Sequence, residues 1–148
     1  MKDYFLYSLI RKENIDYAWL NAMPWIQKSL GSINNYHTEL EHIQAQLREG
    51  FMQLWSIQDT RQGNKPICFI VSHIVQVEGF RTLIIRWCGG ERIEEWLEEI
   101  TTMEKWATNQ NCHKVEIWGR PGWIRAMRRF GYEPEFYVVS KIIQRSVQ

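Results

Sequence analysis

The residues best suited to chemistry lie at one junction of the chain, "RWCGGER", which runs from Arg86 to Arg92. An apolar run ends there in Gly89 and Gly90, and a pattern with helical period begins directly after them. Such junctions often bind phosphate, because the first N–H groups of a helix have no partners within the helix. The glycines would let an anion approach the amides of Gly90, Glu91 and Arg92 closely. The junction therefore predicts an anion-binding site, and a tight turn without a ligand is the alternative.

The charges around the junction support both interpretations. Arg92 would add a charged hydrogen bond to a bound phosphate. Glu91 instead places a carboxylate where the phosphate would lie, and it opens an acidic stretch that continues to Glu104. Carboxylates in the first turn of a helix stabilise that helix by meeting the positive end of its dipole. A charged helix start and a working phosphate site are therefore left open as equal alternatives.

A reaction at this junction would also need a general base, which has to be a carboxylate or an imidazole. By position the candidates are Glu116, His73 and Glu78, and no spacing partner singles out one of them. A lone histidine in a strand, such as His73, is more often a partly buried structural residue than a base. Cys88 lies beside the glycines, but no neighbour in sequence would lower its pKa, so we expect a buried free thiol. The spacing of the histidines and cysteines predicts no metal site.

Composition limits the class of protein that can hold these residues. The chain has 148 residues, of which 45% are hydrophobic and 24% charged, and this predicts one globular domain spanning residues 1–148. No apolar run is long enough to cross a bilayer and the N-terminus is too polar for a signal peptide, so no membrane association is expected. Three scattered cysteines favour a reducing compartment. A net charge of +1 gives no general attraction to nucleic acid or to a membrane.

The elements that must position the junction follow from hydrophobic periodicity and from the places of Gly and Pro. The pattern predicts the order β-α-α-β-β-β-α-β-α-β, an α/β domain with a mixed, largely antiparallel sheet flanked by helices. Strands are expected over residues 4–10, 51–59, 66–77, 81–87, 113–119 and 135–143. Helices are expected over residues 13–23, 38–50, 93–107 and 122–131. Pro24 should bend or end the first helix.

This order of elements, the junction from Arg86 to Glu91 and the later segment "RPGWIRAMRRFGYEP" together resemble the GNAT acyltransferase superfamily. In that family acyl-CoA lies in a gap between a central strand and its neighbour. Its pyrophosphate is held by the N–H groups of a loop with the pattern Arg or Gln, two residues, Gly, one residue, Gly or Ala. Arg86 and Gly89 match this pattern, and Glu91 departs from it. The resemblance implies an acyl-CoA-dependent N-acyltransferase that binds acetyl-CoA or another acyl-CoA through Arg86, Gly89, Gly90, Glu91 and Arg92.

The final predicted helix carries both a match to the GNAT pattern and a departure from it. Gly131 and Tyr132 fit the Gly-aromatic ending of that helix in the family. GNAT enzymes commonly use a tyrosine four residues before this glycine to protonate the departing thiolate, but this chain has Met127 there. The asparagine often found seven residues before the tyrosine is replaced by Arg120. The resemblance therefore implies acyl-CoA binding, whereas the usual proton donor is missing.

The motifs "CGG" and "GRPGW" are more similar to divergent GNAT-like proteins of tailed bacteriophages than to cellular acetyltransferases. This resemblance implies one of two roles. The chain would be an enzyme in the host cytoplasm, or it would be a non-enzymatic virion or head-assembly component. In the second role the fold would serve as an interaction module for phage structural proteins.

Four arginines towards the C-terminus form a further candidate site: Arg120, Arg125, Arg128 and Arg129. In a helix, Arg125 and Arg129 are four residues apart and share a face. Arginine beside tryptophan suits contact with phosphate or with bases, so nucleic acid is a candidate partner whose affinity would fall with salt. A solvated helix face, or pairing with the acidic helix, would explain the same residues.

Overall fold

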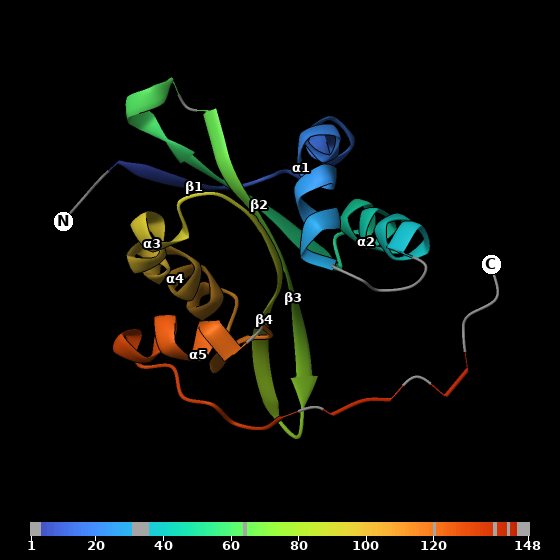
Figure 1. Cartoon of the computed structure of the whole chain (residues 1–148), viewed down its shortest axis with the longest axis vertical. Coiled ribbons are helices and arrows are strands. Elements are labelled where there is room, and N and C mark those ends of the chain that lie inside the picture. Colours follow the sequence, from blue (N-terminus) through green and yellow to red (C-terminus); the bar gives the residue numbers. More distant parts are fainter. Residues whose placement is uncertain are drawn as a thin grey trace.

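A computed structural model describes residues 4–30, 36–63, 65–119, 121–137, 139–141 and 143–144. Its centre is a five-stranded sheet in the order β1-β2-β3-β4-β5 (Figure 1). The strands are β1 Phe5–Leu9, β2 Met52–Asp59, β3 Lys65–Val77, β4 Phe80–Gly90 and β5 Lys114–Ile117. Strands β1 to β4 pair antiparallel with their neighbours, and β5 pairs parallel with β4. The predicted α/β class with a mixed, largely antiparallel sheet is therefore confirmed.

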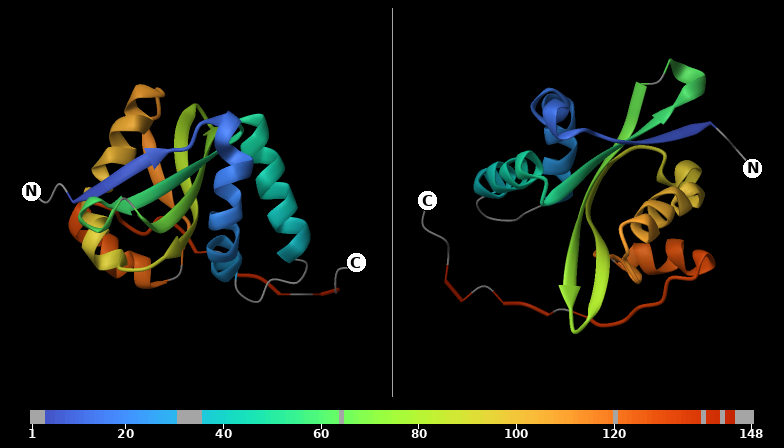
Figure 2. Two further views of the ribbon diagram at one scale, coloured as in Figure 1. Left: turned by 90° about the horizontal axis from the view of Figure 1, so that it is seen from above. Right: turned by 180° about the vertical axis from the view of Figure 1, so that it is seen from behind.

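Helices cover both faces of the sheet (Figures 1 and 2). On one face lie α1 Ile15–Leu30 and α2 Tyr36–Glu49. On the other face lie α3 Ile93–Trp96, α4 Thr101–Asn109 and α5 Pro121–Met127. Short 3-10 turns occur at Lys12–Asn14, Thr60–Gln62, Leu97–Glu99 and Arg128–Phe130. No helix in the part of the chain that the structure describes is long and apolar enough to cross a membrane.

Each face of the sheet has its own apolar core, because successive side chains of a strand point to opposite faces. In β2, Leu54 packs against the side that carries α1 and α2. The next residue, Trp55, packs on the other side against Trp106 of α4, with ring centroids 5.2 Å apart. The Trp55 indole N–H donates to Ser72 Oγ (2.9 Å), so burial of the ring leaves no donor unsatisfied. These two cores hold β3 and β4 in place at the centre of the molecule.

The sequence predicts that Pro24 bends or ends the first helix. The helix does not end there, because α1 continues to Leu30. Proline lacks the N–H that would bond to the carbonyl of Leu20. Leu20 is 73% exposed and Pro24 is exposed as well, so water can bond to that carbonyl instead. The buried face of the helix, which includes Trp19 and Ile26, is unaffected.

The single long helix predicted after the glycines is also wrong: α3, a 3-10 turn and α4 follow one another there. The apolar period continues across the break, which is why periodicity alone does not reveal it. The Ile100 N–H donates to the carbonyl of Leu97 (3.0 Å), as in a 3-10 turn. The carbonyl of Trp96 accepts a hydrogen bond from Tyr7 Oη (2.9 Å) in place of the helical one. A contact from β1 therefore accompanies the break in the helix.

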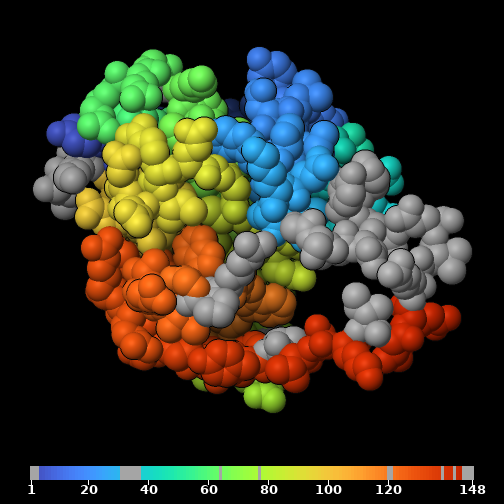
Figure 3. Space-filling view, viewed as in Figure 1, coloured from blue at the N-terminus to red at the C-terminus, as the bar shows by residue number. Residues whose placement is uncertain are grey.

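The last predicted strand, residues 135–143, is wrong, because the described residues of this segment form no strand. An ion pair between Lys114 Nζ and Glu135 Oε1 (2.5 Å) holds the start of the segment beside the first residue of β5. The described residues after Glu135 then run along the surface, as the red segment in Figure 3 shows. Four of its large apolar side chains are exposed: Phe136, Tyr137, Val139 and Ile143. Residues with high strand propensity form a strand only where a sheet edge and a core receive them, and these side chains reach neither.

Candidate functional site

Gly89 and Gly90 belong to strand β4, so the tight turn considered at these glycines is wrong. Neither residue has a positive φ angle. A Cβ atom on Gly89 would lie 2.2 Å from the carbonyl oxygen of Trp25 in α1, and one on Gly90 would lie 2.4 Å from that of Ile67 in β3. The missing side chains therefore let α1 and β3 approach β4 closely. The chain turns two residues later, at Arg92, which has a φ angle of 58°.

Two of the groups predicted to hold phosphate, the Glu91 N–H and the Arg92 guanidinium, have protein partners in this structure. The N–H of Glu91 donates to the carbonyl of Ile67 (2.8 Å). The guanidinium of Arg92 pairs with Asp59 Oδ2 (2.8 Å) and with Glu95 Oε2 (2.5 Å). Phosphate binding through Glu91 and Arg92 stays a prediction, and it requires that these partners be exchanged.

Asp59 explains why Arg92 is held at this position. The side chain of Asp59 is fully buried at the end of β2. Hydrogen bonds from Arg61, and then from Arg92, hold the pKa of this carboxyl well below its usual range despite the opposing effect of burial. The group is therefore charged at neutral pH, and a buried charge is stable only when it is paired. The ion pair ties the turn between β4 and α3 to the end of β2.

Strands β4 and β5 lie together over only part of their length. They are paired from Thr82 and Lys114 to Ile85 and Ile117. A final hydrogen bond runs from the Trp118 N–H to the carbonyl of Ile85 (3.0 Å). Strand β4 then continues, and no strand of the described residues pairs with it on this side. The two strands therefore part in the middle of the sheet.

An irregularity in β4 lies at the place where the strands part. Across the β3–β4 ladder, Val71 faces Trp87 and the next residue, Ser72, faces Ile85, so Arg86 has no residue opposite it. Such a β-bulge bends a strand and increases its twist. We infer that the bulge turns the second half of β4 away from β5.

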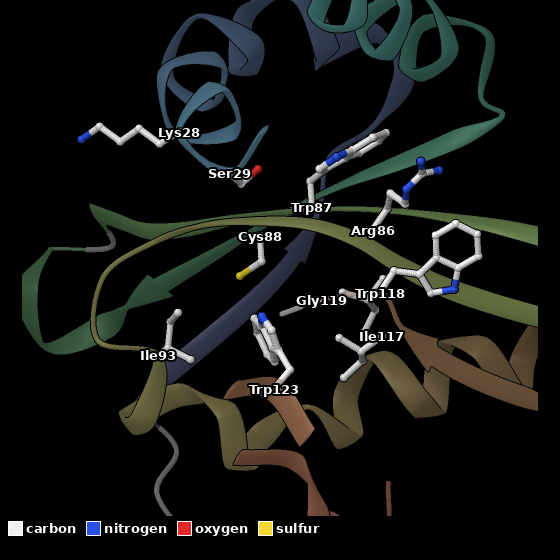
Figure 4. A pocket seen from close by; sticks show the side chains of 11 residues that line it. Lys28, Ser29, Arg86, Trp87, Cys88, Ile93, Ile117, Trp118, Gly119 and Trp123 are labelled. Carbon is white, nitrogen blue, oxygen red and sulfur yellow. The ribbon is translucent and has the colours of Figure 1, made fainter. Parts of the chain in front are cut away.

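A cavity of about 220 Å³ lies in this opening (Figure 4). Its walls come from the end of α1, from β4 and β5, and from α3 and α5, and they include Ser29, Cys88 and Ile93. A Cβ atom on Gly119 would lie 2.3 Å from Trp123 Cδ1. Gly119 therefore makes room for an indole that lines the opening.

Comparison with known proteins gives a match in structure but not in sequence. No protein-family model and no curated protein matches the chain. A predicted acetyltransferase from Clostridium acetobutylicum, solved with acetyl-CoA, is similar with a TM-score of 0.68 and 11% identity, over 94% of this chain and 96% of that one. An aminoglycoside N-acetyltransferase in complex with CoA has a TM-score of 0.65 and 14% identity, over 98% of both chains. A GCN5-related N-acetyltransferase from Ralstonia eutropha JMP134 has a TM-score of 0.70 and 9% identity, over 95% of this chain and 99% of that one.

The chain has the GNAT fold. At these identities the likeness establishes the fold alone, so the chemistry has to be argued from the residues around the opening between β4 and β5.

On the α1 side of this GNAT sheet, Arg86 lies between two indoles. Its guanidinium carbon is 4.6 Å from the ring centroid of Trp87 and 4.8 Å from that of Trp118. The Trp118 indole N–H donates to Glu116 Oε1 (2.9 Å), and Glu116 Oε2 pairs with Lys114 Nζ (3.2 Å). Sequence reasoning missed the tryptophans of this group. Alternation along β5 puts Lys114, Glu116 and Trp118 on one face, and that signal is present in the sequence.

The structure separates the three predicted general bases. Glu116 lies on β5 beside the opening, and His73 lies on the same row of the sheet, with Ile84 between them. Burial, and then the nearby Arg86, lower the pKa of His73, so its imidazole is neutral near pH 7. Its Nε2 is buried and has no hydrogen-bond partner among the described residues. Glu78 lies in the turn between β3 and β4, at the end of β4 that is remote from the opening.

No tyrosine takes the place of the usual GNAT proton donor among the described residues that line the cavity. Met127 is 2% exposed and belongs to the core between α5 and the sheet. Tyr132 donates to Glu104 Oε2 (2.7 Å), and burial, and then this hydrogen bond, raise its pKa. No tyrosine lines the cavity in the described part of the chain. Cys88 does line it as a free thiol, with its Sγ 3.5 Å from that of Cys68.

The arginine cluster is only partly visible, because Arg120 lies outside the described residues. Arg125, Arg128 and Arg129 are exposed on α5 and the turn after it. No ion pair of these three with a described residue is seen, and pairing of the cluster with the acidic helix stays a prediction. Contact with nucleic acid stays a prediction. The described residues hold no group of three or more potential metal ligands.

Proposed function

We propose that the protein is an acyl-CoA-dependent N-acyltransferase, which moves an acyl group from a CoA thioester to an amine. The cavity where β4 parts from β5 carries this proposal, because it offers room for a thioester in the middle of a GNAT sheet. The unpaired edge of β4 beyond the bulge supplies main-chain N–H and C=O groups for the amides of the pantetheine arm. Similar structures that hold acetyl-CoA and CoA support this choice of ligand.

The reaction brings an amine to the thioester carbonyl at the opening. The amine nitrogen attacks the carbonyl carbon, so that a C–N bond forms, the C–S bond breaks and CoA leaves with its sulfur. Because Met127 has no proton to give, the departing sulfur takes up the proton that the amine loses. We assign the relay of this proton to Glu116 of β5, whose carboxylate accepts from Trp118 and pairs with Lys114 in this structure.

The described residues fit the acyl end of such a ligand better than its phosphate end. Ile85 and Ile117 give the cavity apolar walls, whereas Arg92 is engaged by Asp59. Lys28 lines the same cavity, is exposed and has no ion pair with a described residue. Like Arg86, which lines the same cavity, it is therefore a cation available to a phosphate without any exchange of partners.

Calorimetric titration of the purified protein with acetyl-CoA tests the proposal. We expect saturable binding to the wild-type chain. Cys88→Leu should weaken this binding by about tenfold, or about 1.4 kcal/mol, because the larger side chain enters the cavity.

Cys112→Leu is the matched control for that experiment. Cys112 is also a half-buried free thiol, but it does not line the cavity. Circular dichroism of both variants checks that each is folded. Absence of binding to the wild-type chain, or an equal loss in both variants, contradicts the proposal.

A second candidate is a non-enzymatic component of a phage virion or of head assembly, as the bacteriophage-like motifs imply. Two observations favour it: Glu91 and Arg92 are engaged by protein partners, and several apolar side chains near the C-terminus are exposed. Mass spectrometry of purified phage particles tests this role. Presence of the chain in the particles, together with no binding of acetyl-CoA, supports it, and absence from the particles counts against it.

A further inference from the structure

The side chain of Arg86 is held in place without the use of its hydrogen-bond donors. It is half-buried, and the indoles of Trp87 from β4 and Trp118 from the end of β5 enclose its guanidinium (Figure 4). A guanidinium that stacks on aromatic rings keeps the N–H groups at its edge free. No described residue accepts a hydrogen bond from Arg86 or forms an ion pair with it.

The other half-buried arginines among the described residues, Arg81 and Arg92, do have acceptors. Arg81 donates its Nε to the carbonyl of Gln110 (2.8 Å), and Arg92 pairs with the buried Asp59 (2.8 Å). A donor that is withdrawn from water and left unsatisfied costs free energy, and the cost is larger for a charged group. The contrast indicates that the acceptor for Arg86 comes from outside the described chain.

The surroundings leave the charge of Arg86 available to a ligand. Glu116 lies on the neighbouring strand, but it accepts from Trp118 and pairs with Lys114. The hydrogen bond to Trp118 also fixes that indole beside the guanidinium. The charge of Arg86 lowers the pKa of His73, after the larger effect of burial, which agrees with a guanidinium that no carboxylate neutralises.

We propose that Arg86 binds the carboxylate of the acceptor, so that the amines acylated by this protein also carry a carboxylate, as amino acids and short peptides do. This inference rests on the proposed acyltransferase function. The guanidinium fork and a carboxylate are both planar and can form two parallel hydrogen bonds. Arg86 and Cys88 line one cavity from opposite sides of β4 (Figure 4), so a carboxylate held at Arg86 leaves a nearby amine at the opening. The carboxylate is unchanged while the amine forms its bond to the acyl carbon and its proton passes to the departing sulfur.

Matched pairs of acceptors test this assignment on the full-length protein. Each L-amino acid is offered with acetyl-CoA beside its carboxamide, which keeps the amine and removes the negative charge. Release of the CoA thiol is followed with a chromogenic disulfide. We expect kcat/KM for at least one acid to exceed that for its amide by about tenfold or more. In Arg86→Gln the ratio of kcat/KM for the acid to kcat/KM for its amide should fall towards one. The substitution should lower kcat/KM for the acid alone, because only the acid has a carboxylate for Arg86 to bind.

Arg125→Gln is the matched control, since it removes an exposed arginine that does not line the cavity. It should keep the preference for the acid. If wild-type protein acylates acids and amides equally, or if Arg86→Gln lowers both rates equally, the role of Arg86 is overturned while the acyltransferase function stands.

A binding measurement without acetyl-CoA separates this inference from the proposed function. Because Trp87 and Trp118 flank Arg86, a bound carboxylate should change the tryptophan fluorescence. Titration with N-acetylated amino acids, which resemble the products, should give a saturable change that Arg86→Gln loses. Absence of such a change for every compound overturns the carboxylate site, whatever acetyl-CoA does. Carboxylate binding without any binding of acetyl-CoA supports the site and overturns the proposed function.

Discussion

Two arginines near the glycines of β4 show how partners decide what a residue does. Arg86 and Arg92 both lie at the cofactor site that the sequence predicts. Arg92 has a left-handed backbone conformation (φ 58°, ψ 38°), and its side chain pairs with Asp59 and Glu95. Arg86 is the extra residue of a bulge, and its neighbours are aromatic rings. The same residue type therefore closes a turn at one position and stacks on aromatic rings at the other.

Asp59→Asn tests the ion pairs that close this turn. The lowered pKa means that the folded protein keeps this carboxyl ionised at a lower pH than the unfolded chain does, whose ordinary value is 3.8. The ion pairs therefore add stability above about pH 4, and the contribution is lost as the pH falls through the lowered pKa of the folded state. We expect Asp59→Asn to lower the urea midpoint at about pH 7. The difference from wild type should shrink as the pH falls below about 4.

The control for that substitution is Asp16→Asn. Asp16 also pairs with an arginine, Arg48 (2.6 Å), but its side chain is 64% exposed. Exposed ion pairs contribute little to stability because water screens them. The urea midpoint of Asp16→Asn should therefore stay close to that of wild type. Equal effects of the two substitutions would show that burial does not strengthen the pairs of Asp59.

At the scale of elements, β4 is shaped by what packs around it. Its first half is paired on both sides, and its second half is paired with β3 but not with β5. The bulge at Arg86 marks the change, and Gly89 then lies directly under the backbone of α1. The end of pairing with β5, the bulge at Arg86 and the close approach of α1 at Gly89 together produce the opening that the proposed function requires.

Gly89→Ala tests the close approach of α1 to this strand. A Cβ atom there would lie 2.2 Å from the carbonyl oxygen of Trp25, so α1 or β4 has to shift. We expect the free energy of unfolding to fall by about 1–3 kcal/mol, as measured by urea denaturation. Gly122→Ala in α5 is the control, because no described atom lies within 4 Å of its added Cβ. A cost for Gly89→Ala no larger than that for Gly122→Ala would contradict the packing argument.

At the scale of the whole molecule, the chain builds two cores on one sheet, and the described residues of its C-terminal segment lie outside both. Helices cover the two faces, while the described part of that segment runs across the surface (Figures 1 and 3). Phe136 is 61% exposed, Tyr137 76% and Val139 94%. These residues therefore add apolar area to the surface and little to the cores.

Joint replacement of Phe136, Tyr137 and Val139 by Ser measures what this segment contributes. Substitutions at exposed sites without specific contacts usually change stability by less than about 0.5 kcal/mol each. We expect a small change in the free energy of unfolding and less self-association in light scattering at high concentration, because exposed apolar area favours association. A loss of about 3 kcal/mol or more would mean that these side chains are buried in solution.

Local patterns were enough to predict most of the fold. Periods of 3.6 and 2 located α1, α2 and the strands β1 to β5, because the side chains of each element repeat towards one core. Three of the errors, all in the helices and strands, have a different origin. The helix continues past Pro24 because solvent can bond to the carbonyl that the proline leaves free. The helix after Gly90 is broken where Tyr7 bonds to the carbonyl of Trp96. The last strand does not form because its residues do not reach a sheet edge.

The sequence by itself determined the α/β class and the order of the elements as far as α5, since these depend on residues close together in the chain. Only the tertiary structure decided which groups face the opening. It engaged Arg92 with Asp59 and brought Trp118 to Arg86, and it placed Glu78 at the remote end of β4. These outcomes depend on contacts between strands that are distant in sequence, and a local pattern carries no information about which distant residue will be the partner.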